Sequence, residues 1–232
     1  MNRAKPAPIA RTWSRRRAAV FFACLERTCP YPVTELRYET PFQLLAAVLL
    51  SAQSTDRAVN RATEALFRVA PTPQLMVALR AEQLETHLRR LGLYRMKTRH
   101  LLASCRMLIE RFNGEVPSRR EDLEALPGIG RKSANVILNA LYGAPTIAVD
   151  THVFRVANRT GLAPGKTPQA VEEALLKIVP DRYKTRAHHW LVLHGRYVCR
   201  ARVPSCPECA VNRLCTFAGK TTRPSPRTPR SA

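Results

Sequence analysis

Apolar residues recur along most of the chain at the spacing of one face of an amphipathic α-helix. The stretch Phe42–Leu50 is apolar nearly all round, so this helix is expected to lie at the centre of a core. Thr40 should cap it, and Pro41 should occupy its first position. Convincing alternation of apolar and polar residues, the mark of a half-buried strand, does not occur. The pattern therefore predicts an all-α protein with roughly ten helices in two packed groups.

Breakers and caps mark the limits of other helices. A first helix should run from about residue 18 to Thr28, where Cys29-Pro30-Tyr31-Pro32 breaks it. Gly92 supplies a helix stop, so Leu93–Lys97 is predicted to be a short basic loop. Leu93 fits either the core or an outward-pointing wedge. Other helices are expected over 56–69, after Thr72-Pro73 and Thr167-Pro168, and up to Asn113-Gly114 and Gly195.

Two glycines close together connect two apolar segments near the middle of the chain. Ser118 and Glu121 form a Ser-x-x-Glu capping box, which predicts a short helix up to Leu126. Pro127-Gly128-Ile129-Gly130 then makes a tight turn that can expose backbone N–H groups, and the next helix adds the partial positive charge of its N-terminus. Residues 118–141 are therefore predicted to form a helix–hairpin–helix that binds phosphate. The candidate DNA-binding residues here are Leu126, Pro127, Gly128, Ile129, Gly130 and Arg131.

The net charge of the chain indicates which class of binding partner to expect. The 232 residues include 38 basic and 17 acidic side chains, which gives a net charge of +21. A polyanion is the expected partner, and with a phosphate-binding hairpin nucleic acid is favoured over a secreted basic or a ribosome-associated protein. No apolar run is long enough to span a membrane, and we expect a monomer that does not bind membranes. The clustering of the cysteines favours a reducing compartment, the cytoplasm.

Four of the seven cysteines lie in one short segment. Cys199, Cys206, Cys209 and Cys215 are separated by six, two and five residues. Four thiolates this close can bind one metal centre, either a zinc ion or a [4Fe–4S] cluster. The spacing is not that of two Cys-x-x-Cys pairs, which favours iron–sulfur over a zinc ribbon. A redox pair or a disulfide is the minor alternative.

Lys132 and Asp150 are candidates for chemistry. Lys132 follows the hairpin directly, and Asp150 follows an apolar connector expected to return the chain to it. Within such a module a lysine usually only contacts phosphate, and Asp150 is also expected to cap the helix that begins at Thr151. An amine and a carboxylate beside a DNA backbone can, however, act as a nucleophile and its helper. We expect Asp150 to serve in both roles.

Several motifs, in order, resemble the bacterial endonuclease III family. They are Leu49–Asp56, the hairpin segment Leu126–Leu138, Thr146–Val156, His188–Arg196 and the Cys-x6-Cys-x2-Cys-x5-Cys ending, and the resemblance covers about residues 18–217. Members of this family are DNA glycosylases that remove oxidised pyrimidines and abasic-site lyases that cut the strand by β-elimination. The resemblance implies base-excision repair of double-stranded DNA that carries a damaged base or an abasic site.

The resemblance also implies residue roles. Lys132 matches the lysine that forms the Schiff base, and Asp150 matches the family's aspartate. Gln53, which pattern alone favours as a solvated loop residue, matches the glutamine that fills the space of the flipped base. Leu93 matches the leucine that wedges into the opposite strand. The four cysteines match the ligands of a [4Fe–4S] cluster.

The implied architecture has two helical domains with the active site in the cleft between them. A six-helix domain would occupy 34–144, and a discontinuous domain with the cluster would combine 18–33 with 145–217. Composition predicts a basic disordered arm at 1–17 and a disordered basic tail at 218–232. Two other functions remain open: an adenine mismatch glycosylase, whose group lacks the lysine matched by Lys132, and a noncatalytic DNA-binding module.

Overall fold

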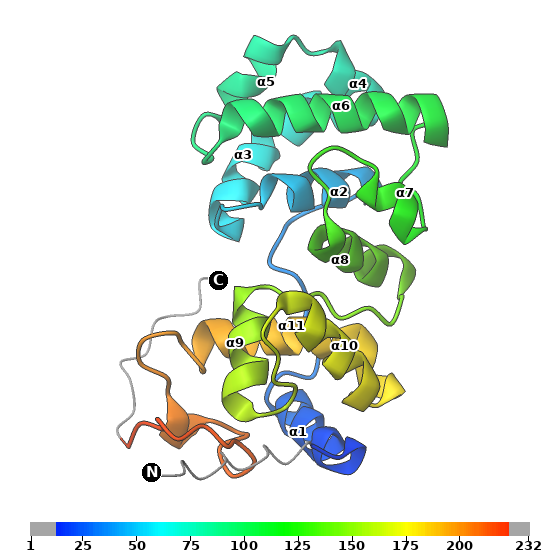
Figure 1. The fold of residues 1–232 in the computed structure, drawn as a ribbon. Helices are drawn as coiled ribbons and strands as arrows, with labels where there is room; N and C mark the ends of the chain where they lie inside the picture. Colours follow the sequence, from blue (N-terminus) through cyan, green and yellow to red (C-terminus); the bar gives the residue numbers. More distant parts are fainter. Residues whose placement is uncertain (1–12, 223–232) are drawn as a thin grey trace, which may run out of the picture. The chain divides into compact units, whose positions relative to one another are not determined.

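The computed structural model describes residues 13–222, and this part of the chain is all-helical (Figure 1). The all-α prediction is confirmed, with one more helix than the roughly ten expected from pattern. The α-helices are α1 (Arg15–Thr28), α2 (Pro41–Leu50), α3 (Asp56–Val69), α4 (Pro73–Ala78), α5 (Ala81–Leu88), α6 (Tyr94–Phe112), α7 (Arg120–Glu124), α8 (Arg131–Tyr142), α9 (Thr151–Thr160), α10 (Pro168–Ile178) and α11 (Asp181–Tyr197). A short 3-10 helix, η1, spans Cys206–Glu208.

Contacts divide the chain into two compact units. One is Val33–Ala148, which contains α2 to α8, seven helices where the sequence suggested six. The break at Leu79 and Arg80 separates α4 from α5 and accounts for the extra helix. The other unit joins the chain up to Pro32 to the chain from Val149 onward, and it holds α1, α9, α10, α11 and η1. Among the described helices, none has both the length and the apolar character needed to cross a membrane.

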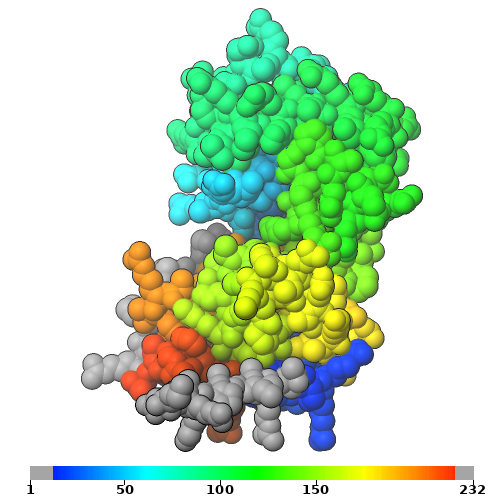
Figure 2. Space-filling model, viewed as in Figure 1, coloured from blue at the N-terminus to red at the C-terminus, as the bar shows by residue number. Residues whose placement is uncertain are grey.

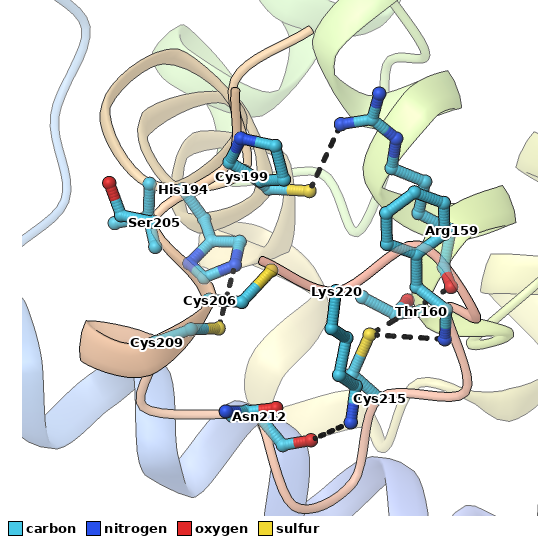
Figure 3. A pocket seen from close by; sticks show the side chains of 13 residues that line it. Arg159, Thr160, His194, Cys199, Ser205, Cys206, Cys209, Asn212, Cys215 and Lys220 are labelled. Carbon is cyan, nitrogen blue, oxygen red and sulfur yellow. Dashed lines mark hydrogen bonds between the residues drawn. The ribbon is translucent and has the colours of Figure 1, made fainter. Parts of the chain in front are cut away.

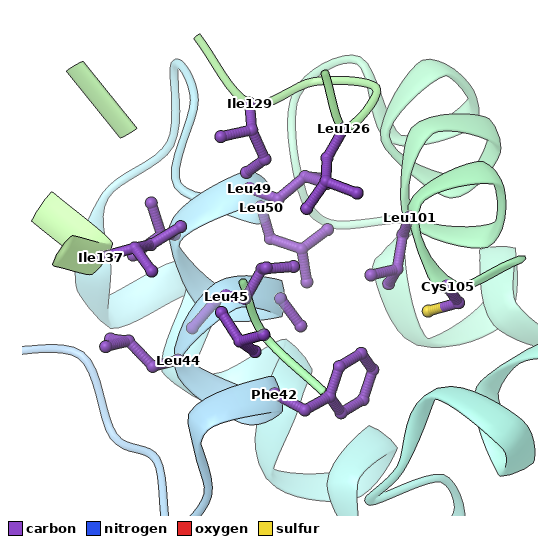
Figure 4. Close-up of a cluster of buried hydrophobic side chains, with 14 of the residues drawn as sticks. Phe42, Leu44, Leu45, Leu49, Leu50, Leu101, Cys105, Leu126, Ile129 and Ile137 are labelled. Carbon is purple, nitrogen blue, oxygen red and sulfur yellow. The ribbon is translucent and has the colours of Figure 1, made fainter. Parts of the chain in front are cut away.

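Helix α2 is central in the unit Val33–Ala148, as its all-round apolar pattern predicts. Every residue from Phe42 to Leu50 is buried, and α2 packs against α3, α6 and α8. Burial of each large aliphatic side chain contributes about 1.5–3 kcal/mol. Leu126 and Ile129 of the hairpin enter the same core, beside Leu49 and Leu50 (Figure 4). The core therefore fixes the hairpin through its apolar residues.

Threonine caps begin four of the helices. Thr40, Thr72 and Thr167 each precede a proline, and each side chain accepts a hydrogen bond from the backbone N–H three residues later. Thr55 caps α3 in the same way. These helix starts are confirmed, because an N-cap oxygen and a proline at the first helical position act locally.

The N-terminal helix begins earlier than expected, at Arg15 rather than near residue 18. Trp13 is buried against Phe21, and the Arg17 guanidinium lies 4.2 Å from the Trp13 ring centroid and donates to the Leu214 carbonyl at 2.7 Å. These contacts structure 13–17, so the expected disordered arm is wrong for those residues. Residues 1–12 and 223–232, the rest of the expected arm and most of the tail, lie outside the described residues.

The start of the tail is also structured. Thr221 donates through its hydroxyl to the Pro204 carbonyl and accepts from the Cys206 N–H at 3.3 Å. Lys220 donates to the Asn212 carbonyl at 2.7 Å. Residues 218–222 are therefore part of the fold, because their polar side chains satisfy backbone groups of the cysteine-bearing segment. In the space-filling view, that segment lies against α9 (Figure 2).

Three local predictions are wrong at helix ends. Tyr94–Lys97 is the first turn of α6 rather than a loop, with Leu93 as its N-cap. Helix α5 ends at Leu88, before the predicted stop at Gly92, and α11 continues past Gly195 to Tyr197. These ends depend on packing with neighbouring helices, which overrides weak local signals.

The predicted capping box does not form. Helix α7 begins at Arg120, with Arg119 rather than Ser118 at the N-cap and without a side-chain cap hydrogen bond. Val116, just before, is buried, and its carbonyl accepts a hydrogen bond from the Tyr142 hydroxyl at the end of α8. A tertiary contact therefore holds the chain just before α7, which begins one residue later than the capping box predicts.

Candidate functional site

The turn between α7 and α8 alternates buried and exposed residues. Leu126 and Ile129 are buried, whereas Gly128 and Gly130 are exposed. The Ile129 N–H donates to the Leu126 carbonyl at 3.0 Å, which closes the turn. Leu126 and Ile129 thus anchor the turn in the core, and a ligand can meet only the backbone of this stretch and its exposed residues. This refines their expected role as DNA-binding residues.

Helix α6 holds the turn from beneath. The Ser104 hydroxyl donates to the Pro127 carbonyl at 2.8 Å, and Ser104 is fully buried. Gly128 has φ +84°, a left-handed conformation that L side chains rarely adopt, and a Cβ there would lie 2.9 Å from His100 Nδ1. The sequence signalled the glycine but not its partners Ser104 and His100, because their contacts are long-range.

The two glycines of the turn should respond differently to substitution. Gly130, the N-cap of α8, has φ −100° and free space where a Cβ would stand. We expect Gly128→Ala to destabilise the protein by roughly 1–2 kcal/mol from backbone strain alone, with more from the His100 contact. Gly130→Ala should cost less, about 0.5 kcal/mol, because alanine is a poorer N-cap than glycine but meets no strain or contact there. Denaturant unfolding of both variants checks this, and equal stabilities would contradict the strain argument.

Lys132 is the second residue of α8 and is exposed, next to exposed Arg131. The first intrahelical hydrogen bond of α8 is donated by the Ala134 N–H to the Gly130 carbonyl at 2.9 Å. The N–H groups of the preceding helical residues therefore point out of the helix start, where the helix dipole favours an anion. Lys132 is thus exposed at the same helix start as these N–H groups.

The Asn139 side chain and the main-chain carbonyl of Asn135, both on α8, fix the chain that leaves this helix. Asn139 Nδ2 donates to the carbonyls of Ala144 and Thr146, at 3.0 and 3.2 Å. The Thr146 hydroxyl donates back to the Asn135 carbonyl at 2.7 Å. These buried hydrogen bonds shape the connector that precedes Asp150. Sequence reasoning missed them, because buried asparagines on an apolar helix carry no local signal.

Asp150 caps α9, as predicted. Its Oδ1 accepts the Val153 N–H at 2.8 Å, and the side chain is only partly buried. One oxygen serves the cap, which leaves lone pairs of the other for further contacts. Asp150 also raises the pKa of Arg155 slightly against the larger lowering by burial. Lys132 belongs to the unit Val33–Ala148 and Asp150 to the other unit.

Gln53 and Leu93 lie on two neighbouring turns of the unit Val33–Ala148. Both have left-handed backbones, with φ 52° and 58°, and both side chains are exposed, Leu93 at 52 %. A Cβ on Gly92 would lie 3.7 Å from the Gln53 carbonyl oxygen, so the two turns are adjacent. Its exposure shows that Leu93 points outward rather than into the core. A left-handed backbone at an exposed leucine is also costly.

All four clustered cysteines line one pocket (Figure 3). It is formed by the end of α11, the last two residues of α9, and the chain around and after η1 up to Lys220. Arg159 Nη1 donates to Cys199 Sγ at 3.9 Å, and the Phe217 N–H donates to Cys215 Sγ at 3.5 Å. Among residues 13–222, His, Cys, Asp and Glu side chains form no group of three or more placed to hold a single metal ion. The four thiols instead surround a shared space.

Burial sets the protonation of this pocket. It raises the pKa of Cys209 to about 11 and raises that of Cys199, although Arg159 opposes the second shift. It lowers the pKa of His194 to about 4, so the ring is neutral at physiological pH. His194 Nε2 lies 3.6 Å from Cys209 Sγ. The raised pKa values keep Cys199 and Cys209 protonated when free, and a bound metal centre would have to displace these protons.

Arg159 links the pocket to the segment that carries the cysteines. Its guanidinium donates to the carbonyls of Arg200 and Ala201, at 2.7 and 2.6 Å, and lies 4.9 Å from the Phe217 ring centroid. Sequence reasoning did not single out this residue. An arginine at the second-to-last position of α9 looks like a surface cation until the fold places the segment beside it.

Comparisons with known proteins place this fold and these features in one class. Residues 46–181 match the family model described as HhH-GPD superfamily base excision DNA repair protein. Endonuclease III of Escherichia coli (strain K12) is 54% identical over 196 residues, which cover 84% of this chain and 93% of that protein. Endonuclease III of Haemophilus influenzae is 55% identical over 191 residues, 82% of this chain and 90% of that protein.

Solved structures agree. A non-covalent endonuclease III–DNA complex matches with a TM-score of 0.84 and 41% identity over 88% of this chain and 96% of that one. A trapped endonuclease III–DNA covalent intermediate matches with a TM-score of 0.83 and 41% identity over 88% and 97%. The fold defines a DNA glycosylase of base excision repair. The chain belongs to the endonuclease III family.

Proposed function

We propose that this chain removes oxidised pyrimidines from double-stranded DNA and cuts the strand through a Schiff base on Lys132. The observation that carries the proposal is the place of Lys132, exposed on the second residue of α8 and directly after the glycine turn. A turn that binds the DNA backbone would bring the sugar of a flipped nucleotide to this amine. Family membership and the DNA-bound relatives support the same assignment.

The reaction needs the amine in its neutral form. The Lys132 nitrogen bonds to C1′ of the sugar while the glycosidic bond breaks, and the base leaves with the bonding electrons and takes up a proton. Opening of the sugar ring gives an imine between Lys132 and C1′. Loss of a C2′ proton then expels the 3′ phosphate, which cuts the strand. Water finally hydrolyses the imine and restores Lys132.

Asp150 is the helper in this proposal. Its carboxylate stabilises the positive charge that develops on the sugar and takes part in the proton transfers. The N-cap hydrogen bond to the Val153 N–H, 2.8 Å long, orients the carboxylate while its remaining lone pairs face the reaction. Gln53 enters the space left by the flipped base, and Leu93 enters the opposite strand. Both assignments are supported by exposed side chains on adjacent turns.

A [4Fe–4S] cluster is the proposed cofactor, held by Cys199, Cys206, Cys209 and Cys215. The donor set fits, because four thiols line one pocket, and Arg159 and the Phe217 N–H already donate to two of the sulfurs. When bound, the cluster supplies four iron–thiolate bonds that cross-link the segment. That segment carries exposed Arg202 and Arg213. Its order would therefore serve DNA binding. A substrate of genomic DNA supports a cytoplasmic protein, associated with the nucleoid if the protein is bacterial.

One assay separates this proposal from its alternatives. A duplex with a single thymine glycol is incubated with the protein, and base release and strand cleavage are followed separately. We expect both, with cleavage on the 3′ side. No release of thymine glycol, with release of adenine from a second duplex that carries an adenine mismatch and without cleavage of either strand, would favour a mismatch glycosylase. Binding with neither product would leave a noncatalytic module.

Asp150→Asn isolates the carboxylate from the cap. Asparagine caps helices about as well as aspartate, so the hydrogen bond from the Val153 N–H and the stability should persist. We expect the single-turnover rate of base release to fall by about 10²–10⁴-fold, the usual contribution of a positioned acid–base group. Thermal unfolding serves as the control. Unchanged base release in a stable Asp150→Asn protein would remove Asp150 from the chemistry.

A further inference from the structure

Two exposed turns in the unit Val33–Ala148 share an unusual backbone. Among residues 13–222 the non-glycine residues with positive φ are Gln53, Leu93 and Asn113. Asn113 ends α6 ahead of Gly114, a common place for asparagine. Gln53 and Leu93 have no such local reason, and their turns are adjacent, since the Gln53 carbonyl lies 3.7 Å from a Cβ placed on Gly92. Something outside each turn must hold both conformations.

Lys97 contacts both turns. It is only 2 % exposed, and its Nζ donates to the Ser54 hydroxyl at 2.7 Å, next to Gln53. Lys97 lies in the first turn of α6, where its backbone N–H makes the opening helical hydrogen bond to the Leu93 carbonyl at 3.0 Å, so the side chain joins the turn of Leu93 to Ser54. Burial lowers the pKa of Lys97, so a lysine is an expensive residue at this position. Because it is buried, its amine is not available to phosphate, unlike the exposed Arg95 and Arg99 on the same helix.

We propose that Lys97 is a positioning residue that holds the Gln53 turn and the Leu93 turn as one preorganised wedge. The inference rests on the proposed function, in which both side chains enter the duplex. Two independent turns would each lose conformational freedom when they enter the opened base stack of the DNA duplex. A link between them removes most of that loss before DNA binds, which favours their joint insertion.

The test uses Lys97→Met, which keeps the length and apolar stem of the side chain but removes the donor. Ser54→Ala removes the acceptor, and the double variant removes both. The matched control is Ser51→Ala, because the Ser51 hydroxyl donates at 2.7 Å to Val48 within its own helix and makes no link between the turns. Each protein is assayed in single turnover on thymine glycol in a duplex and on an abasic site in a single strand, where no stack has to open.

We expect Lys97→Met and Ser54→Ala to slow the duplex reaction by on the order of 10²-fold, the effect of small misplacements at a reacting site. The double variant should be no slower than either single one, since all three remove the same hydrogen bond. Ser54→Thr, which keeps a hydroxyl, should restore the rate. Strand cleavage at the single-stranded abasic site and the Ser51→Ala control should match the unmodified protein.

Two outcomes separate failure of this inference from failure of the proposed function. Equal slowing of both substrates by Lys97→Met, or unchanged duplex rates, would overturn the positioning role. Gln53→Ala and Leu93→Ala test the underlying assignment directly. If neither slows the duplex reaction, the two side chains do not enter the duplex, and the roles proposed for Gln53 and Leu93 fall together with the inference.

Discussion

Lys132→Ala is expected to abolish the covalent adduct that borohydride traps between this protein and DNA with an abasic site. Borohydride reduces the imine to a stable amine, so the adduct reports the Schiff base directly. Alanine cannot form an imine, and strand cleavage should fall by on the order of 10³-fold or more, as when a nucleophile is removed from an enzyme. Denaturing gels that resolve protein linked to labelled DNA provide the measurement.

The neighbouring cation supplies a matched control. Arg131 is exposed at the first position of α8, and Lys132 at the second. Arg131→Ala and Lys132→Ala each remove one positive charge from the same helix start. Both should therefore weaken DNA binding and reduce its salt dependence by a similar amount. Only Lys132→Ala should lose the adduct. An undiminished adduct in that variant would mean that another amine is the nucleophile.

Lys132 is tolerant of substitution as far as the fold is concerned. Its side chain is exposed, whereas the residues that anchor α8 to the core, such as Ala134 and Ile137, follow it on the buried face. Alanine is also the best helix former. Loss of the adduct can therefore be assigned to chemistry rather than unfolding, and unchanged thermal stability of Lys132→Ala checks this.

What could be predicted from the sequence is chiefly what acts locally. The threonine caps and the Asp150 cap are signalled within a few residues, and each forms as predicted. The capping box at Ser118 was equally local, yet α7 begins one residue later, after a buried stretch held by the Tyr142 hydroxyl. A local signal is reliable only where no distant contact competes for the same backbone.

The site shows the same limit. Gly128 and the four cysteines could be singled out from their types and spacing. Lys97 could not, because a lysine in a basic stretch is expected on the surface, and only the fold brings its amine to Ser54. The left-handed backbones of Gln53 and Leu93 also leave no trace in residue type. For Lys132, the hairpin alone favoured a phosphate contact, the pairing with Asp150 pointed to a nucleophile, and the family resemblance added the Schiff base.

Cys209→Ser is expected to remove the metal centre and the broad visible absorbance of an iron–sulfur protein. Cys209 is one of four thiols on the pocket wall, and its Sγ lies 3.6 Å from His194 Nε2. Iron–sulfur clusters select soft thiolate ligands, and serine provides a hard oxygen instead. Absorbance and iron content per chain are the measurements, and both should fall to background.

The control is a cysteine of the same unit outside the pocket. Cys24 lies on α1, and Cys24→Ser should retain iron and colour. In Cys209→Ser the segment 199–215 loses its cross-link, although Arg159 still holds the carbonyls of Arg200 and Ala201. We expect Arg202 and Arg213 to bind phosphate less well as a result. The slope of DNA affinity against salt concentration should then fall by about one for each arginine that loses its phosphate contact. Stoichiometric zinc in a colourless parent protein, or full iron in Cys209→Ser, would contradict the cluster assignment.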